Sequence, residues 1–328
     1  MPRLSIIIPL RGAAEPFEAT LASVLQNLPP ACEVLVPHAG PYHDPYDLAD
    51  EVRFIEQPAD ATVVDLLNAG VAESAAEILH VLASGVEVVE GWTNAAVEHF
   101  DDPEVAAVSP LILDAADKNR IVTKGVNYGS GGRRRICGAK AVLRERSTRR
   151  VRVAGPTLAA GFYRTATLDA LGGFERAVGD ELADIDIALS FQAIGQRCVF
   201  EPQSRLHSPP LAVPTGSFGA GRRAERLFLR HAPQRGWLWS LLLHPFVVAA
   251  SAIGDLPHPG AATQLLGRAT ACFEFGRHRA YREQLTAARE RIVEAQSEES
   301  PVVMRVDTSA ALQRIAMQPS AAPKRRAA

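Results

Sequence analysis

The chain has 328 residues, of which 47% are hydrophobic and 22% charged, and its formal net charge is −2. These values are typical of a globular protein that can hold one large α/β domain and an appendage. The near-neutral charge argues against a nucleic-acid-binding protein. The four cysteines stand far apart, so neither a zinc site nor a disulfide framework is predicted, and a reducing, cytoplasmic compartment is expected.

The N-terminal third of the chain alternates short apolar runs with amphipathic stretches. Strands are predicted at 4–9, 33–36, 52–55, 77–82 and 105–113, because each run is apolar and bounded by turn residues. Helices are predicted from Pro16 onward, over 62–73 and over 92–100, where apolar side chains recur at helical spacing. The alternation predicts a mostly parallel sheet whose ligands lie beyond the carboxyl ends of the strands. No signal peptide is expected, because the first strand begins at Leu4.

The second half of the chain is less regular. Glycine and arginine dominate residues 114–153, which are expected to form a mobile loop or an extended excursion. Helices are predicted over 165–171, 184–194, 221–230 and 273–295, and a strand over 196–201. Residues from 298 onward are polar and rich in Ala and Pro, and are predicted to be disordered. Three parts are therefore expected, at 1–212, 213–297 and 298–328.

Residues 237–253 are the most apolar stretch of the C-terminal region. They are shorter than the roughly 20 residues that span a bilayer, and His244-Pro245 interrupts them. Two interpretations remain open: a buried helix pair, or an interfacial contact with a membrane.

Five short segments carry the candidate chemistry. In chain order they are Ser5 to Pro9, Asn68-Ala69-Gly70, the run Leu82 to Val88, Asp184 at the start of a helix, and Pro202 to His207. In this order and spacing they resemble the family 2 glycosyltransferases, which carry the GT-A fold. The resemblance covers about Leu4 to His207. It implies an α/β, Rossmann-like, mostly parallel sheet flanked by helices, followed by a C-terminal helical extension.

The resemblance implies a nucleotide-sugar donor bound along the carboxyl ends of the first strands. His38 occupies a place where relatives carry an acid that binds the base or ribose, and it is alternatively a solvated loop histidine. The donor-binding residues that the resemblance implies are Pro9, Arg11, His38, Asn68, Ser84, Glu87 and His207.

The bend after the fourth strand departs from the family pattern. Relatives hold Mg²⁺ or Mn²⁺ there with carboxylates, the ligands that such hard cations prefer. Ala83 and Gly85 offer no ligand, and Ser84 offers only a neutral hydroxyl. Glu87 lies about 6.6 Å further along the strand. No metal ligand is therefore predicted, although a divalent cation is expected for the family.

Asp184 inherits the position of the family's catalytic base. Inverting transfer needs a base that takes the proton of the acceptor hydroxyl, and a helix N-terminus keeps a carboxylate ionised. Ala183 replaces the first acid of the usual pair, and a helix cap is the alternative role for Asp184. Asp186 lies about 200° around the helix from Asp184. The acceptor-binding residues implied are Tyr163, Arg164, Gly173, Phe174 and Asp186.

A basic run extends from Arg133 to Arg152 with one acid, Glu145. It is either a solvated loop or a source of arginines that neutralise the leaving nucleoside diphosphate without a metal. Nucleic-acid binding is disfavoured, because no aromatic residues alternate with the arginines.

The leading hypothesis is an inverting glycosyltransferase that moves a sugar from a nucleotide-sugar donor to a hydroxyl of a glycan or lipid-linked acceptor. The alternative is a catalytically inactive relative that binds a sugar nucleotide, a glycan or a partner protein. A nucleotidyltransferase is disfavoured, because only Arg11-Gly12 follows the first strand where a glycine-rich loop with a lysine is needed. The expected location is cytoplasmic, extending to the inner face of the membrane. The enzymatic hypothesis requires Asp184 and the bend at 83–85 to face one crevice.

Overall fold

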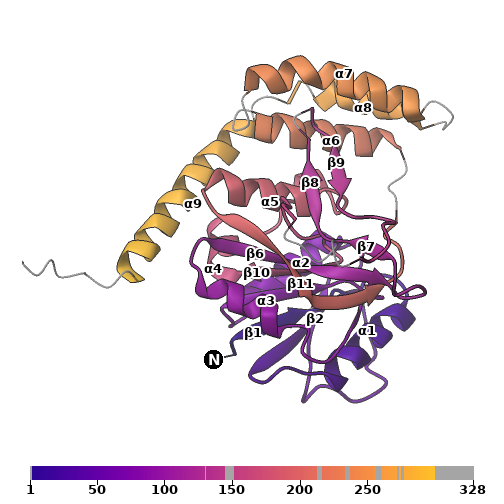
Figure 1. The fold of residues 1–328 in the computed structure, drawn as a ribbon, viewed down its shortest axis with the longest axis vertical. Helices are drawn as coiled ribbons and strands as arrows, with labels where there is room; N and C mark the ends of the chain where they lie inside the picture. Colours follow the sequence, from indigo (N-terminus) through magenta and orange to yellow (C-terminus); the bar gives the residue numbers. More distant parts are fainter. Residues whose placement is uncertain are drawn as a thin grey trace, which may run out of the picture. The chain divides into compact units, whose positions relative to one another are not determined.

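The computed structural model of the chain describes residues 2–129, 131–144, 151–212, 216–232, 237–255, 260–271, 273–274 and 277–299 (Figure 1). Residues 1–292 form one compact unit and residues 293–328 a second. Nearly all of the tail predicted at 298–328 lies outside the described residues, as does the part of the basic run at 145–150. The division at residues 212 and 213 stays a prediction.

A nine-stranded sheet forms the centre of the described residues. Its strand order is β3-β2-β1-β4-β10-β6-β11-β5, and β7 pairs with β6. Strands β1, β2, β3, β4, β6 and β11 run in one direction, and β5, β7 and β10 run in the other, which confirms the mostly parallel sheet. The strand bounds are Leu4–Ile7 (β1), Cys32–Ala39 (β2), Arg53–Gln57 (β3), Ile78–Leu82 (β4), Glu87–Val88 (β5), Val105–Asp114 (β6), Ile121–Thr123 (β7), Ala160–Arg164 (β10) and Arg197–Ser208 (β11).

Helices cover both faces of this sheet, and every residue of β1 and β4 is buried, as expected of parallel strands in an α/β sheet. On one face Ile6 and Leu82 pack in a core cluster with residues of α1 and α3, and on the other Ile7 and Val81 pack with α2, α4 and α5. The helix bounds are Ala14–Gln26 (α1), Val63–Glu73 (α2), Asn94–Glu98 (α3), Thr165–Ala170 (α4) and Ala183–Ala193 (α5), with short 3₁₀ turns at His99–Asp101 and Arg176–Val178.

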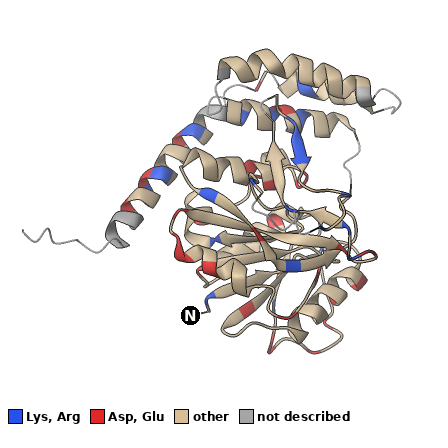
Figure 2. Ribbon diagram, in the orientation of Figure 1, with Lys and Arg blue, Asp and Glu red and all other residues tan. Residues whose placement is uncertain are grey.

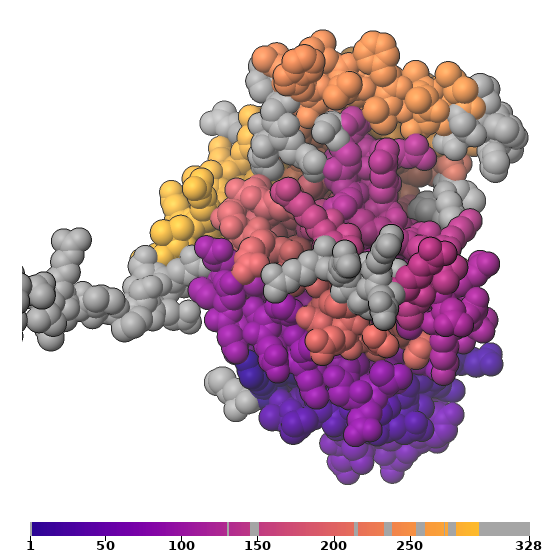
Figure 3. Space-filling view, in the orientation of Figure 1, coloured from indigo at the N-terminus to yellow at the C-terminus, as the bar shows by residue number. Residues whose placement is uncertain are grey.

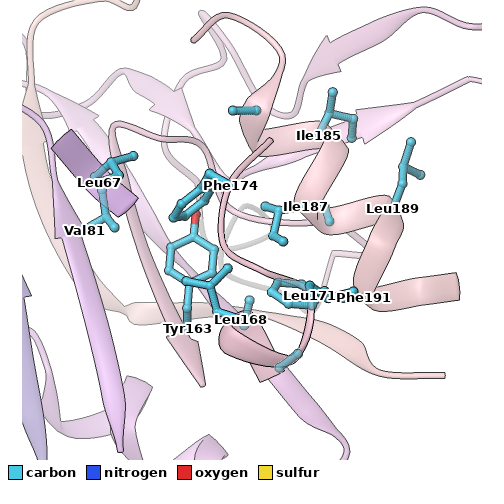
Figure 4. Packing of buried hydrophobic residues seen from close by; sticks show 14 of the residues in the cluster. Leu67, Val81, Tyr163, Leu168, Leu171, Phe174, Ile185, Ile187, Leu189 and Phe191 are labelled. Atoms are coloured by element: carbon cyan, nitrogen blue, oxygen red, sulfur yellow. The ribbon is translucent and has the colours of Figure 1, made fainter. Parts of the chain in front are cut away.

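The central strand β10 has no counterpart in the sequence analysis. It pairs antiparallel with both β4 and β6. Phe162 stacks on the ring of His80 at 3.7 Å on one face of the sheet. Tyr163 points to the other face and packs edge-on against Phe174, as Figure 4 shows. The strand therefore joins the two core clusters on opposite faces of the sheet.

Residues 114–144 are more ordered than the predicted loop. They contain β7 and a separate hairpin of β8 (Val126–Tyr128) and β9 (Arg134–Ile136). The hairpin rises from the sheet toward the C-terminal helices (Figure 1), and the carbonyl O of Gly131 at its tip lies 2.8 Å from His244 Nδ1. Part of the basic run is therefore built into a strand.

The C-terminal helical extension is confirmed. Its helices are α6 (Phe218–His231), α7 (Trp237–Asp255), α8 (Ala261–Ala271) and α9 (Arg277–Glu299). Glu225 of α6 joins three of them, because its carboxylate contacts His244 of α7 and Arg268 of α8. Among the described helices, none combines the length and the apolar character needed to cross a bilayer.

Candidate active site

A cavity of about 470 Å³ lies beside the carboxyl end of β4, where ligands bind in sheets of this kind. Asp184 and Ala83 both line it, so the base candidate and the bend face one cavity, as the enzymatic hypothesis requires. The lining residues come from α2, the bend, β9, the segment before β10, the segment before α5, α5 itself and the segment between β11 and α6: Val63, Ala83, Arg134, Ile136, Thr157, Leu158, Ala159, Asp180, Glu181, Asp184, Leu211, Ala212 and Ser217.

Asp184 lies in the first turn of α5, and both oxygens of its carboxylate are engaged by neighbouring donors. Its Oδ1 accepts hydrogen bonds from Arg134 Nε at 2.9 Å and from the backbone N–H of Ile185 at 2.7 Å, and its Oδ2 pairs with Arg134 Nη2. The residue is 2% exposed. Burial raises the pKa of the Asp184 carboxyl, while Arg134 and backbone N–H groups act to lower it. Leu182 occupies the N-cap position of α5 without a side-chain cap, and Asp184 accepts a hydrogen bond from the first-turn N–H of Ile185, so Asp184 also satisfies part of the helix end.

Arg134 is the site residue that the sequence analysis did not single out. It lies on β9, 50 residues before Asp184, and its guanidinium makes a two-point contact with that carboxylate. The only sequence signal was its membership of the basic run. Fork-shaped donors of this kind also bind phosphate oxygens, so Arg134 is a candidate anion-binding group in the cavity wall.

Asp180 and Glu181 are acids of the cavity that the sequence analysis also missed. Asp180 accepts hydrogen bonds from the backbone N–H groups of Val63 at 3.2 Å and Val64 at 3.1 Å, at the N-terminus of α2. Glu181 pairs with Arg223 of α6. Both carboxylates therefore tie neighbouring elements to the wall of the cavity, and they stand in the sequence just before the helix that carries Asp184.

The bend at 83–85 does not fit a divalent cation. Ser84 Oγ donates to the carbonyl of Pro9 at 3.1 Å, and Gly85 N–H donates to Thr20 Oγ1 at 2.9 Å. Gly85 has φ +88°, which favours glycine. No carboxylate lies in the bend, and the described part of the chain contains no group of three His, Cys, Asp or Glu side chains that could hold a metal ion. The expected cation of the family thus lacks ligands at its usual position.

The sequence matches no protein-family model and no curated protein. Among solved structures, the chain is similar to GalNAc-T7 in its crystal structure with UDP, GalNAc and Mn²⁺, with a TM-score of 0.53 and 15% identity over 69% of this chain. The chain has the GT-A fold. The match spans 47% of the GalNAc-T7 chain. The mannosyltransferase PcManGT from Pyrobaculum calidifontis, in complex with GDP-Man and Mn²⁺, matches with a TM-score of 0.47 and 17% identity over 89% of this chain and 87% of that chain.

Three predicted donor residues gather at the carboxyl edge of the GT-A sheet without lining the cavity. The backbone of Pro9 is fixed by Ser84, and Arg11 Nε donates to the carbonyl of Ala61 at 2.9 Å. His38 is buried, and its Nδ1 lies 2.7 Å from the carbonyl O of Gly40. The alternative of a solvated loop histidine is therefore wrong for His38, which lies on a strand of the sheet.

Glu87 and His207 are neighbours at the far edge of the same sheet. They stand opposite each other on the antiparallel strands β5 and β11, and neither lines the cavity. Partial burial lowers the pKa of the His207 imidazole; Lys118 acts in the same direction and Glu87 in the opposite one. The two residues form a surface pair beside the bend.

Two predicted acceptor residues, Tyr163 and Arg164, do not line the cavity. Tyr163 is fully buried in the core, where burial raises the pKa of its hydroxyl well above the ordinary value. Arg164 lies at the opposite end of the sheet, where it donates to the carbonyls of Phe100 at 2.7 Å and Asp102 at 2.9 Å. Neither residue lines the cavity, and β10 runs antiparallel to β4 and ends away from the bend. The acceptor role of both residues stays a prediction.

Gly173 and Phe174 line a second cavity of about 430 Å³ together with Asn68. The side-chain amide of Asn68 donates to the carbonyl of Phe174 at 2.9 Å and accepts from its N–H at 2.8 Å. Gly173 has φ +82°, and a Cβ there would meet Asn68 Oδ1 at 2.5 Å. In the structure Asn68 holds this glycine turn through both hydrogen bonds, and its role in donor binding stays a prediction.

Asp186 is buried on the opposite side of α5 from Asp184. Its Oδ1 lies 2.8 Å from His231 Nε2 and 3.1 Å from Arg230 Nε, both on α6. It does not line either cavity. Asp186 therefore joins α5 to α6, and its role in acceptor binding stays a prediction.

Proposed function

We propose that the chain is a glycosyltransferase that moves a sugar from a nucleotide-sugar donor to a hydroxyl of a glycan or lipid-linked acceptor, with inversion. The observation that carries the proposal is the cavity in which Asp184, Arg134 and the bend at Ala83 meet, at the ligand-binding edge of a GT-A sheet. GalNAc-T7, which shares the fold, was solved with UDP, GalNAc and Mn²⁺, which supports the class of donor.

Asp184 acts as the base in this proposal. Its carboxylate takes the proton of the acceptor hydroxyl while the hydroxyl oxygen bonds to the anomeric carbon. The bond from that carbon to the phosphate oxygen breaks, and the nucleoside diphosphate leaves with the electron pair. Burial raises the pKa of Asp184, which makes the carboxylate a better proton acceptor than an exposed aspartate.

Arg134 has two roles in the proposal. In the structure its guanidinium occupies the Asp184 carboxylate through two hydrogen bonds. A donor diphosphate offers the same guanidinium a more highly charged partner. If the Arg134 guanidinium exchanged Asp184 for the diphosphate as its partner, it would neutralise the leaving group. The Asp184 carboxylate could then accept the proton of the acceptor hydroxyl. Donor binding would thus release the Asp184 carboxylate from Arg134 before proton transfer.

The proposal assigns no step to a metal ion, because Ala83, Ser84 and Gly85 supply no carboxylate where the family's cation is held. The arginine described above carries the neutralising charge instead. The proposed location is the cytoplasm or the inner face of a membrane.

The second candidate is a binding protein without turnover, which takes up a sugar nucleotide, a glycan or a partner protein. The closed pair of Arg134 and Asp184, together with the 2% exposure of Asp184, favours it. A carboxylate that stays in this pair cannot accept a proton from an acceptor.

A donor screen separates the two candidates. Thermal shift with a panel of nucleotide sugars identifies a donor, and hydrolysis of that donor is then measured in EDTA and in Mn²⁺. Turnover in EDTA that disappears in Asp184→Asn supports the enzyme. A thermal shift without turnover in either condition supports the binding protein.

A further inference from the structure

Helix α7 turns its polar side chains toward the protein and its apolar side chains outward. Ser240 and His244 are buried, and His244 lies between the carbonyl of Gly131 and the carboxylate of Glu225. On the opposite face, large apolar side chains recur at helical spacing. The large apolar residues of α7 that are exposed are Leu238, Trp239, Leu241, Leu242, Leu243, Phe246 and Ile253.

This exposure contradicts the buried helix pair, one of the two interpretations left open for 237–253. Leu242 is 61% exposed, and Trp239 and Phe246 are each 74% exposed. The sequence has no Asp, Glu, Lys or Arg between residues 237 and 254, and Asp255 is the last residue of α7. Figure 2 shows the coloured part of α7 in tan. In Figure 3 the outer atoms of α7 and α8 (orange) are uncovered on the face in view. A contiguous apolar surface of this kind marks an interaction site.

We propose that this outer face of α7 docks on an anionic lipid bilayer, with the helix lying at the level of the headgroups. Trp239 and Phe246 supply the aromatic side chains that favour the boundary between water and lipid. Pro245 lies inside the helix and has no N–H, so the carbonyl four residues earlier lacks its helical donor and needs water or another donor. At the level of the headgroups, the aromatic side chains reach the lipid, and water is still available to the carbonyl that Pro245 leaves without a donor.

Positive charge beside α7 complements an anionic surface. The tip of the β8–β9 hairpin packs against α7, and a cavity of about 90 Å³ lies between them. Arg133, Arg134 and Arg268 line this cavity together with Val247 and Val248. Arg134 pairs with Asp184 and Arg268 with Glu225, so Arg133 is the arginine of the three that is exposed beside α7. Arg133 and Arg135 are exposed, and neither has an acidic partner among the described residues. Arginines placed next to an apolar face bind anionic lipid phosphates.

The same charges argue against a second copy of the chain as the occupant. A two-fold dimer through this face gathers the hairpin arginines of both copies into one interface. Arg133 and Arg135 have no acidic partner among the described residues, and concentrating such like charges in an interface is unfavourable. A lipid surface supplies the missing negative charge.

Flotation of the full-length protein with vesicles tests the proposal. The protein is expected to float with vesicles of equal parts phosphatidylglycerol and phosphatidylcholine, and to be released by high salt. The double variant Leu242→Asp/Phe246→Asp should lower the bound fraction about ten-fold or more, because both charges enter the apolar face. The matched control Leu28→Asp/Tyr46→Asp changes two exposed side chains elsewhere and should float like the parent.

A second measurement does not depend on the folding of the aspartate variants. Brominated lipids should quench the fluorescence of the parent protein, and the quenching should fall in Trp239→Phe. The proposal is overturned if the parent stays in the unbound fraction, or if the control loses binding as strongly as the double variant. It is also overturned if sedimentation shows a dimer that the double variant dissociates while neither protein floats. None of these readouts needs turnover, so the proposed function can fail independently.

Discussion

Arg134 holds Asp184 by a two-point contact across the wall of the cavity, with Nε donating to Oδ1 at 2.9 Å. The arginine belongs to a hairpin and the aspartate to the first turn of α5, and the bend that lacks carboxylates faces the same space. A buried carboxylate next to one guanidinium is stable as a closed pair and becomes chemically available only when the guanidinium has another partner. The stability of the site and the availability of Asp184 as a base are therefore expected to depend on the Arg134–Asp184 pair.

The first prediction concerns the stability of the pair. Arg134→Met leaves the 3%-exposed carboxyl side chain of Asp184 without its cation, and we expect a loss of about 3–5 kcal/mol in the free energy of unfolding. Arg134→Met combined with Asp184→Leu should cost less than the sum of the single changes. Urea unfolding of all three variants measures the coupling. The exposed pair of Arg3 and Asp101 is the control, and Arg3→Met should cost less than about 1 kcal/mol.

The second prediction restores acids at the bend. Ala83→Asp with Gly85→Asp should create binding of Mn²⁺, because the two carboxylates would stand where relatives carry them. A Cβ at Gly85 would meet only Pro16 and Pro209, at 3.8 Å, so there is space for it, although the positive φ adds strain.

Calorimetry with Mn²⁺ checks this double variant. The control is Ala193→Asp with Gly195→Asp, which repeats the same spacing and the positive φ at an open position. Absence of Mn²⁺ uptake by the bend variant, or equal uptake by the control, would contradict the alignment of the bend with the family's metal motif.

The third prediction concerns pH and His80. This residue is fully buried, accepts a hydrogen bond from Trp92 Nε1 at 3.0 Å and stacks on Phe162. Burial lowers its pKa from 6.5 to about 3. Below pH 6.5 the His80 imidazole is therefore protonated in the unfolded chain and stays neutral in the folded protein.

The stability from this group is present above pH 6.5 and falls by about 1.4 kcal/mol per pH unit as the pH drops toward 3. Urea unfolding at several pH values measures the slope, and His80→Gln should reduce it, whereas His43→Gln on an exposed loop should not. A His80 imidazole that titrates near pH 6.5 by NMR in the parent protein would refute the prediction.

The fourth prediction separates anchoring from acceptor binding at Asp186. Because its carboxylate contacts His231 and Arg230 of α6, Asp186→Asn should lower stability by about 1–3 kcal/mol and increase proteolysis within α6. Turnover of a donor by the folded variant should be unchanged. A variant with parental stability and strongly reduced transfer to acceptor would restore the acceptor role expected from the sequence.

Much of the GT-A sheet could be predicted from the sequence because its strands are continuous apolar runs. Residues 4–9 and 77–82 read as buried parallel strands, and the family resemblance implied that Asp184 and the bend face one crevice. The strand at Ala160–Arg164 was missed, because five residues that include a glycine give no clear period. Without that strand, the burial of Tyr163 and the remote position of Arg164 could not be foreseen.

The contact between Arg134 and Asp184 could not be predicted either. It depends on a hairpin that carries the arginine to a helix 50 residues later, and hydrophobic periodicity contains no information on such a pairing. The sequence left the role of α7 open. Its composition indicated either burial or a membrane contact, and only the structure shows which side chains face the protein.

The central claim is that Asp184 takes a proton in a cavity where Arg134 replaces the metal at the bend. Its most direct test is single-turnover donor cleavage with acceptor in EDTA, for the parent and for Asp184→Asn, with Asp50→Asn as a surface control. The account predicts turnover in EDTA and a loss of about 100-fold or more in Asp184→Asn alone. Equal rates in the parent and Asp184→Asn, or turnover only when Mn²⁺ is added, would contradict it.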